Sequence, residues 1–196
     1  MKIYDSKFKK EIEFEPLEEG EVSIYICGPT VYDVAHLGHG RSAVSFDIIR
    51  KYFEYKGYKV KFVSNYTDID DKMIKRALEE GISVENLAKK IIPEYEKDYE
   101  ALGIAKPSLQ PKATDHVEEI ISIIKRLDEG GYTYVLPDGV YFDVGRYKAY
   151  GQLSGQNLED LKAGARIDVN EDKRNPYDFV VWKFKKEGEP SWQSPW

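Results

Sequence analysis

The feature that most constrains this chain is a short apolar segment followed at once by a glycine, a proline and an amphipathic stretch. Residues 22–27 are almost continuously apolar and rich in branched and aromatic side chains, which is typical of a strand covered on both faces of a parallel sheet. Gly28 and Pro29 end this strand, and apolar residues then recur at helical spacing to about Tyr55. The order predicts a strand, a tight turn and a helix, which together open an α/β fold.

Two histidines lie where this helix is expected to begin. His36 and His39 are three residues apart and therefore share one face of the helix. The amino end of a helix has unpaired N–H groups and a partial positive charge, which suit phosphate oxygens. Gly38 and Gly40 keep side chains out of the way, so that a nucleotide can approach the backbone. On spacing alone such a pair more often caps a helix or is merely exposed, and its position after a buried strand favours a ligand site.

A second strand and a group of acidic residues follow. Residues 59–66 have the composition of a strand, and the intervening length accommodates a helical crossover, which predicts a parallel pair. Three aspartates lie within residues 68–71, just past the end of that strand. Their spacing favours capping of the next helix, which should end at Gly81, over lining a pocket.

The next part of the chain predicts further helices. Residues 83–102 have a helical pattern that Pro93 should kink or divide, and residues 106–112 form the best linker, with two prolines among polar residues. Thr114 is expected to cap another helix, which ends at residues 130–131.

The last part predicts antiparallel structure. A hairpin is expected over residues 132–144, a short helix at 158–161 and a strand at 179–182. We therefore expect a parallel α/β region over residues 1–104 and an α+β region over residues 105–196.

Composition places the chain among ordinary soluble globular proteins, with 41% hydrophobic and 33% charged residues. It contains no apolar run near the ~20 residues that span a bilayer, and its first residues lack the apolar core of a signal peptide, so we expect a cytoplasmic protein without a membrane partner. The net charge of −6 argues against a chain-wide electrostatic grip on nucleic acid, although positive charge can be concentrated locally. The single cysteine, Cys27, can be a buried filler, a reactive thiol or one metal ligand, and composition favours the filler.

Several of these segments resemble motifs of a known enzyme family. His36-Leu37-Gly38-His39 is similar to the HIGH signature of class I aminoacyl-tRNA synthetases, and CGPTVYD at residues 27–33 resembles the cysteinyl-tRNA synthetases specifically. Other segments that resemble motifs of this family are NYTDIDDK at 65–72, KATDH at 112–116, GAR at 164–166, DKRNPYDF at 172–179 and GEPSWQSPW at 188–196. These matches are colinear from residue 27 to the last residue, which makes chance an unattractive explanation.

The resemblance implies a cysteine–tRNA ligase, which activates L-cysteine with ATP to cysteinyl-adenylate and transfers it to tRNA(Cys) for protein biosynthesis. It also implies that residues 1–104 are the first half of a Rossmann-like class I nucleotide-binding fold. Residues 105–196 would be a connective-peptide insertion, truncated at its end.

The same resemblance assigns roles at the start of the predicted helix. His36 and His39 would be catalytic and would bind the phosphates of ATP, with Mg²⁺ accompanying the nucleotide. Thr30, Gly38 and Gly40 would complete the ATP site. A neighbouring phosphate would favour the charged imidazolium form of a histidine.

A pocket for the amino acid is implied as well. Cys27 would be one ligand of Zn²⁺, a metal that prefers thiolate and so can select cysteine over serine, and this role reverses the filler interpretation. Gly28 and Thr67 would lie beside the substrate. The other zinc ligands of the family, its KMSKS loop and its anticodon-binding region lie beyond the residue at which this chain stops. We therefore expect an amino-terminal part that is inactive alone and has the missing carboxyl-terminal half as a partner.

Two alternatives stay open. A cysteine ligase of mycothiol-type thiol biosynthesis makes the same adenylate but passes it to an amino-sugar. A non-catalytic half-domain that acts as a binding module is the other, and it would be expected to lose the signature residues that stand intact here.

Overall fold

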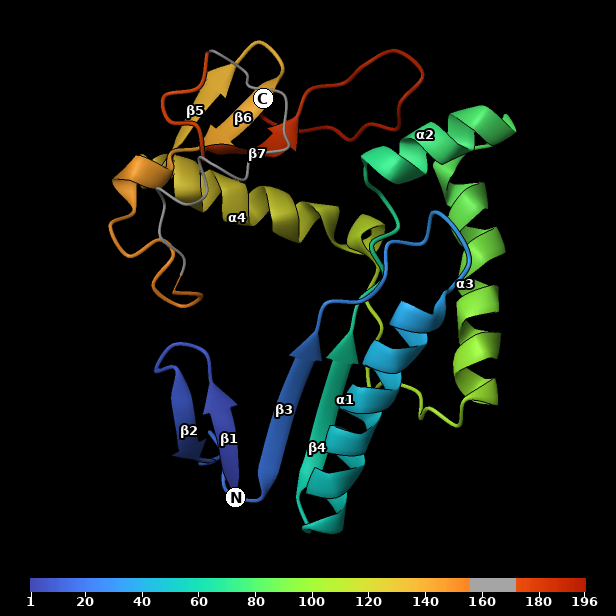
Figure 1. Ribbon diagram of the computed structural model, residues 1–196. Helices are drawn as coiled ribbons and strands as arrows, with labels where there is room; N and C mark the ends of the chain where they lie inside the picture. Colours follow the sequence, from blue (N-terminus) through green and yellow to red (C-terminus); the bar gives the residue numbers. More distant parts are fainter. Residues whose placement is uncertain (156–171) are drawn as a thin grey trace. The chain divides into compact units, whose positions relative to one another are not determined.

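The computed structural model describes residues 1–155 and 172–196. Contacts within the chain divide it into two compact units. Figure 1 shows the chain coloured from its amino end to its carboxyl end. Residues 15–117 form one, which we call the parallel unit, and residues 1–14 with 118–196 form the other, the antiparallel unit.

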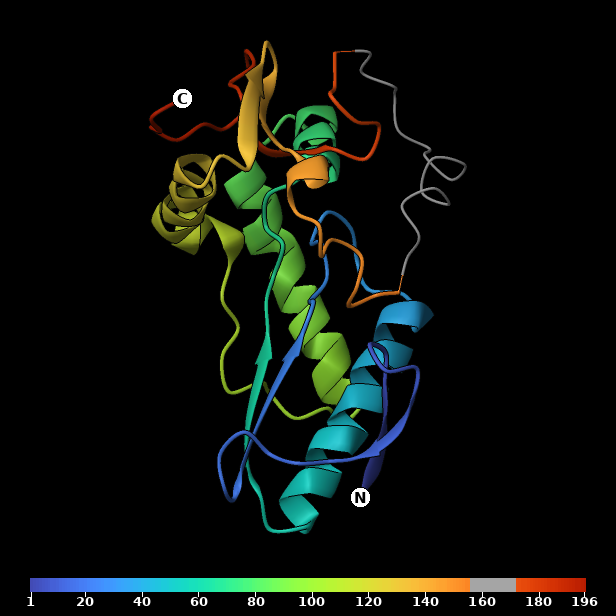
Figure 2. The same ribbon diagram turned by 90° about the vertical axis from the view of Figure 1, so that its left-hand side faces the viewer.

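The parallel unit starts with a strand, a crossover helix and a second strand. β3 (Glu21–Ile26) and β4 (Lys59–Ser64) pair in parallel, and α1 (Leu37–Tyr55) connects them, which confirms the prediction for this region. Figure 2 shows α1 on one face of this pair. Because the strands are parallel, their carboxyl ends meet at the same edge of the sheet, where the expected site residues follow.

The parallel unit contains two further helices after β4. α2 (Asp71–Glu80) ends at Gly81, whose positive φ of 66° suits a glycine, and α3 (Val84–Ala101) is capped by Ser83. α3 runs unbroken through Pro93, so the expectation that this proline divides the helix is wrong. Pro93 is exposed, and solvent can therefore hydrate the carbonyl group that its missing N–H leaves unpaired.

The segment expected to be a linker is instead a further extended strand-like segment beside β4. The Ser108 N–H donates to the Phe62 carbonyl at 2.7 Å, and the Ser64 N–H donates to the Leu109 carbonyl at 3.2 Å. This pairing continues with the Tyr66 N–H, which donates to the Pro111 carbonyl at 2.8 Å. A proline is compatible with such an edge position because its carbonyl can still accept, so the linker interpretation of residues 106–112 is wrong.

The same unit ends in a short 3₁₀ turn, Ala113–His116, after which α4 (Val117–Glu129) begins. Thr114 lies inside this turn, and its N–H and hydroxyl both donate to the buried carboxylate of Asp68. The expectation that Thr114 caps a helix is therefore wrong, because its hydroxyl is bonded to Asp68.

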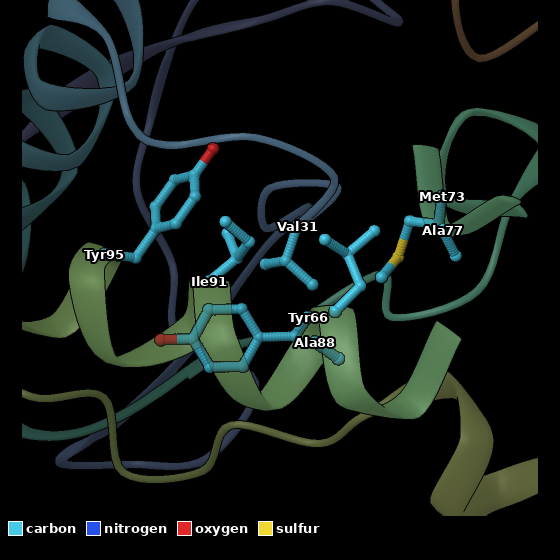
Figure 3. Packing of buried hydrophobic residues seen from close by; sticks show 8 residues of the cluster. Val31, Tyr66, Met73, Ala77, Ala88, Ile91 and Tyr95 are labelled. Carbon is cyan, nitrogen blue, oxygen red and sulfur yellow. The ribbon is translucent and has the colours of Figure 1, made fainter. Parts of the chain in front are cut away.

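Helices α2 and α3 pack on a buried cluster that also includes residues from the segments after β3 and β4. Val31 and Tyr66 lie in it beside Met73, Ile91 and Tyr95 (Figure 3). This packing fixes the segments that leave the two strands, and thereby the candidate site.

Within its described residues, the antiparallel unit has two small sheets. β1 (Lys2–Asp5) pairs with β2 (Lys10–Glu13). β5 (Thr133–Leu136), β6 (Gly139–Phe142) and β7 (Phe179–Lys183) form a three-stranded antiparallel sheet, which confirms the expected hairpin and last strand.

The remaining elements of this unit are helical. α4 buries the side chain of Ile124, and a 3₁₀ turn over Val144–Arg146 follows β6. The helix expected at residues 158–161 and the GAR segment lie outside the described residues. The units change at residues 117–118, later than the expected boundary at 105, and the assignment of residues 105–196 to an insertion stays a prediction.

Candidate functional site

Two backbone segments run side by side just beyond the ends of β3 and β4. The Val31 N–H donates to the Thr67 carbonyl at 3.2 Å, and the Thr67 N–H donates to the Pro29 carbonyl at 3.0 Å. Thr30 and Thr67 therefore form a parallel bridge, although they are far apart in the sequence. The structure thus brings together two residues that sequence analysis had assigned to ATP and to the amino acid.

Asn65 joins these two segments through its side chain. Its Oδ1 accepts from the Gly28 N–H at 2.9 Å and from the Tyr25 hydroxyl at 3.0 Å, while its Nδ2 donates to Thr67 Oγ1 at 3.3 Å. A Cβ atom on Gly28 would lie 1.5 Å from the Asn65 carbonyl oxygen, so this close approach requires glycine. Sequence analysis noted Asn65 within a motif but gave it no role, because its partners come from another strand.

Cys27 is exposed next to Gly28, and its Sγ lies 3.8 Å from the Gly28 carbonyl oxygen. The filler interpretation is therefore wrong, whereas a metal ligand and a reactive thiol both remain compatible with this position. Within residues 1–155 and 172–196, no three His, Cys, Asp or Glu side chains are grouped to hold a metal ion. Cys27 can supply one ligand, but these residues by themselves do not form a complete zinc site.

His36 and His39 cap the start of α1 in a reciprocal arrangement. His36 is the N-cap residue, and its Nδ1 accepts from the Gly38 N–H at 3.1 Å. The His36 backbone N–H in turn donates to Nδ1 of His39 at 3.2 Å. The rings are stacked, with centroids 3.9 Å apart and planes at 28°. The alternative that the two histidines cap the helix is thus confirmed, and the capping places both imidazoles side by side.

These bonds determine which nitrogen of each neutral ring carries the proton. A nitrogen that accepts from an N–H cannot itself be protonated, so each Nδ1 is the acceptor and each Nε2 carries hydrogen. His36 is exposed and His39 is partly exposed. His36 and His39, which we call the histidine corner, therefore offer two stacked Nε2–H donors beside the amino end of α1.

His39 is held in its neutral form. Its pKa is lowered from the ordinary value of 6.5, first by burial and second by the charge of the adjacent His36. Before any phosphate arrives, His39 is therefore a neutral donor at physiological pH, whereas sequence analysis expected a phosphate to favour the charged form.

The glycines of the corner have packing roles of their own. A Cβ atom on Gly38 would come within 2.9 Å of Cε1 in the His36 ring, and one on Gly40 would lie 3.2 Å from Cδ1 of Leu102. Gly38 thus leaves room for the capping imidazole, and Gly40 allows α1 to approach the end of α3. Their contact with a nucleotide stays a prediction.

Tyr95 of α3 also contacts the corner, and sequence analysis missed it. Its hydroxyl lies 3.4 Å from Nδ1 of His39, and the two rings meet edge to face with centroids 5.4 Å apart. Tyr95 is only 1% exposed and packs near Val31 and Ile91 (Figure 3). In the sequence it looks like any core position of an amphipathic helix, so only the tertiary structure reveals this contact.

The aspartates after β4 serve the fold. Asp70 caps α2 by accepting from the Met73 N–H at 2.9 Å, which confirms the capping interpretation for this residue. Asp68 is 4% exposed and holds Thr114 instead. Neither carboxylate is bonded to a histidine of the corner.

A cavity of ≈ 240 Å³ lies in the same unit, between the strands, α1, the end of α3 and residues 104–110. Its walls are mainly apolar and include Phe62 and Tyr99. None of the site residues expected from the sequence lines it, so it is separate from the histidine corner.

Comparison with protein families finds a match to tRNA synthetases class I (C) catalytic domain over residues 13–196. Curated relatives include the cysteine–tRNA ligase of Clostridioides difficile strain 630, 53% identical over 196 residues, and that of Shewanella amazonensis, 51% identical over 197 residues. Each alignment covers 100% of this chain but only 42% or 43% of the relative. The chain thus spans less than half the length of these relatives.

Solved structures share the fold. The methionyl-tRNA synthetase of Mycobacterium tuberculosis in complex with methionyl-adenylate aligns with a TM-score of 0.53 at 22% identity, covering 57% of this chain and 23% of that protein. The LeuRS–tRNA–LeuAMS complex of Agrobacterium radiobacter K84 aligns with a TM-score of 0.54 at 18% identity, covering 66% and 17%. The described helices include none that is both long and apolar enough to cross a bilayer.

Proposed function

The chain belongs to the class I (C) tRNA synthetase family, and from this membership we propose that it is the amino-terminal part of a cysteine–tRNA ligase. Such an enzyme activates L-cysteine with ATP to cysteinyl-adenylate and transfers the cysteine to tRNA(Cys). The relatives that carry the name cysteine–tRNA ligase match the whole chain at about half identity, which supports cysteine as the amino acid. Residues of the relatives beyond this chain would supply the rest of the enzyme.

The observation that carries the proposal is the corner after β3. Two stacked imidazoles there present Nε2–H donors beside the amino end of α1, and Cys27, Gly28, Thr30 and Thr67 lie along the adjoining strand ends. Donors of this kind are suited to phosphate oxygens, and the carboxyl edge of a parallel sheet is where α/β folds bind ligands.

In the proposed reaction the carboxylate of cysteine attacks the α-phosphorus of ATP, and pyrophosphate leaves. Negative charge builds on the phosphoryl oxygens in the transition state. Nε2–H groups of His36 and His39 would donate to these oxygens, and their mutual capping holds both rings in place before ATP arrives. Mg²⁺ would accompany the nucleotide.

We propose that Gly28 and Thr67 border the amino acid and that Cys27 faces its side chain. When bound, a zinc ion would bind the substrate thiolate and so separate cysteine from serine. The described residues group no three side chains that could hold such an ion, and we propose that Cys27 is joined by ligands from residues of the ligase beyond this chain.

Transfer to tRNA would require regions that the longer relatives possess. We propose tRNA(Cys) as the second substrate, the carboxyl-terminal half of the ligase as the partner of this chain, and the cytoplasm, where proteins are made, as its location. The chain by itself should charge little or no tRNA.

Cysteine-dependent exchange of pyrophosphate into ATP tests this proposal. The assay compares the 196-residue chain with a ligase of the relatives' full length that begins with this chain, which we call the full-length ligase. We expect exchange that depends on cysteine in the full-length ligase and little exchange by the chain alone. A full-length ligase that shows no cysteine-dependent pyrophosphate exchange would refute the proposed activity. Robust exchange by the chain alone would refute its dependence on the other half.

A further inference from the structure

We propose that Tyr95 is a positioning residue for the reaction, which holds His39 as a neutral Nε2–H donor toward phosphate. This inference rests on the proposed function and adds a residue from α3 to the histidine corner. It follows from the contacts of one ring nitrogen, Nδ1 of His39.

Nδ1 of His39 faces two hydrogen-bond donors. The His36 backbone N–H lies 3.2 Å away, and the hydroxyl of Tyr95 lies 3.4 Å away. An imidazolium would place its own Nδ1–H against the His36 N–H, so protonation of the ring would break the cap that orients it. The neutral ring can keep both contacts, and it then has its hydrogen on Nε2.

Tyr95 is well placed to act only as a donor. It is 1% exposed, and its hydroxyl contacts His39 from within the packed cluster of α2 and α3 (Figure 3). Burial raises the pKa of Tyr95 to about 12, so the hydroxyl keeps its proton over the whole physiological range. A side chain fixed by packing on α3 therefore limits the rotation of a ring on α1.

The titratable groups around this contact come from three segments. His36 stacks on His39 from the cap of α1, and Tyr95 meets it from α3. Tyr99 of α3 packs edge to face on Tyr95, and Tyr32 and Asp33 lie near Tyr95 in the segment after β3. The adjacent His36 ring also disfavours a charge on His39 and lowers its pKa. Loss of the Tyr95 hydroxyl removes a hydrogen-bond donor that only the neutral ring can accept, so we expect the pKa of His39 to rise.

The test replaces Tyr95 by phenylalanine in the full-length ligase, which removes the hydroxyl and keeps the ring in the cluster. The matched control is Tyr66→Phe, because Tyr66 is 3% exposed in the same cluster and its hydroxyl instead accepts from Gln110. Nitrogen NMR of labelled histidine rings, assigned with His39→Gln, follows the tautomer and the titration of His39. We expect a titration at higher pH in Tyr95→Phe and none of this change in Tyr66→Phe.

Kinetics of pyrophosphate exchange provide the second measurement. Loss of one positioning hydrogen bond should lower kcat/KM for ATP about three- to tenfold, and the acid limb of its pH profile should move to higher pH. The KM for cysteine should stay constant, because the Cys27 end of the site has no bond to Tyr95.

The outcomes separate the two proposals. If Tyr95→Phe leaves both the His39 signals and kcat/KM for ATP unchanged, or if Tyr66→Phe changes them equally, Tyr95 does not position His39. If the wild-type ligase shows no cysteine-dependent exchange, the proposed function fails, while the histidine spectra still decide whether Tyr95 orients the ring.

Discussion

Two motifs, one in each unit of the molecule, use their polar residues in opposite ways. Segments of both units resemble motifs of one enzyme family, and both units hold polar side chains on a buried framework. In the motif around Asp178 of the antiparallel unit the polar atoms bond to one another, whereas at His36 and His39 of the parallel unit donors face outward.

Asp178 represents the antiparallel unit. It is 1% exposed, and its carboxylate accepts from the Tyr134 hydroxyl at 2.8 Å, the Val144 N–H at 2.9 Å and the Asn175 N–H at 3.0 Å. Arg174 lies over the ring of Tyr134, 4.3 Å from its centroid. These bonds join β5, the turn after β6 and the segment before β7, so the fold explains why an aspartate stands at this position.

The histidine corner represents the parallel unit. There the fold uses one nitrogen of each imidazole for capping and leaves the other, Nε2–H, available at a partly exposed surface. The comparison teaches that motif resemblance does not separate folding residues from binding residues. The hydrogen-bond partners of each polar atom do.

The largest expected effect is on activity. His39→Ala in the full-length ligase removes one donor to the phosphoryl oxygens, and we expect cysteine-dependent exchange to fall about 10²- to 10³-fold. The free energy of unfolding should change by no more than about 1 kcal/mol, since the loss is mainly that of a capping contact.

His116→Ala is the control for this measurement, because His116 is exposed in the turn before α4. It should leave exchange near the wild-type rate. Equal exchange by His39→Ala and the wild type would mean that His39 does not donate to the phosphoryl oxygens, and the contrast with Asp178 would then be wrong.

A smaller effect is expected from Asp178→Asn, which should destabilise the fold by about 2–4 kcal/mol because an amide cannot accept all three buried donors. Chemical denaturation of the chain measures this loss. Asp138→Asn is matched to it, since Asp138 also accepts from a tyrosine hydroxyl but is exposed, and its cost should be about 0.5 kcal/mol or less. Equal costs would mean that Asp178 does not organise the antiparallel unit.

How far the sequence predicts this molecule depends on the range of the interactions. β3, α1 and β4 follow from local apolar periodicity, and the capping of α2 by Asp70 follows from its position before the helix. The strand-like segment at 106–112 was missed because its prolines indicate a linker, and its partner β4 lies far away in the chain.

The site shows the same division. Motif resemblance places His36 and His39 together, and the structure adds how they cap each other. Asn65 and Tyr95 act through partners on other elements, so neither periodicity nor spacing distinguishes them from ordinary turn and core residues.

The smallest effect is a pH dependence shared by both units. Burial is the main cause that raises the pKa of Tyr66, Tyr95 and Tyr134 from 10.0 to about 12. The folded state holds these protons more tightly, so their contribution to stability is complete below pH 10 and is lost as the pH rises through about 12.

Phenolate absorbance and denaturation between these pH values test the prediction. Among the 15 tyrosines these three should ionise late, as should Tyr99, whose pKa burial also raises, together with a loss of stability. Ionisation of all tyrosines near pH 10 in a fully folded chain would contradict the burial of Tyr66, Tyr95 and Tyr134.

The central claim is that the two capped imidazoles bind phosphate through Nε2. The most direct measurement is nitrogen NMR of histidine rings in the full-length ligase while ATP with Mg²⁺ is added, with assignments from His36→Gln, His39→Gln and His116→Gln. We predict that the Nε2 signals of His36 and His39 move together as ATP binds and that those of His116 stay in place. Unchanged His36 and His39 signals at ATP concentrations that saturate pyrophosphate exchange would contradict the account.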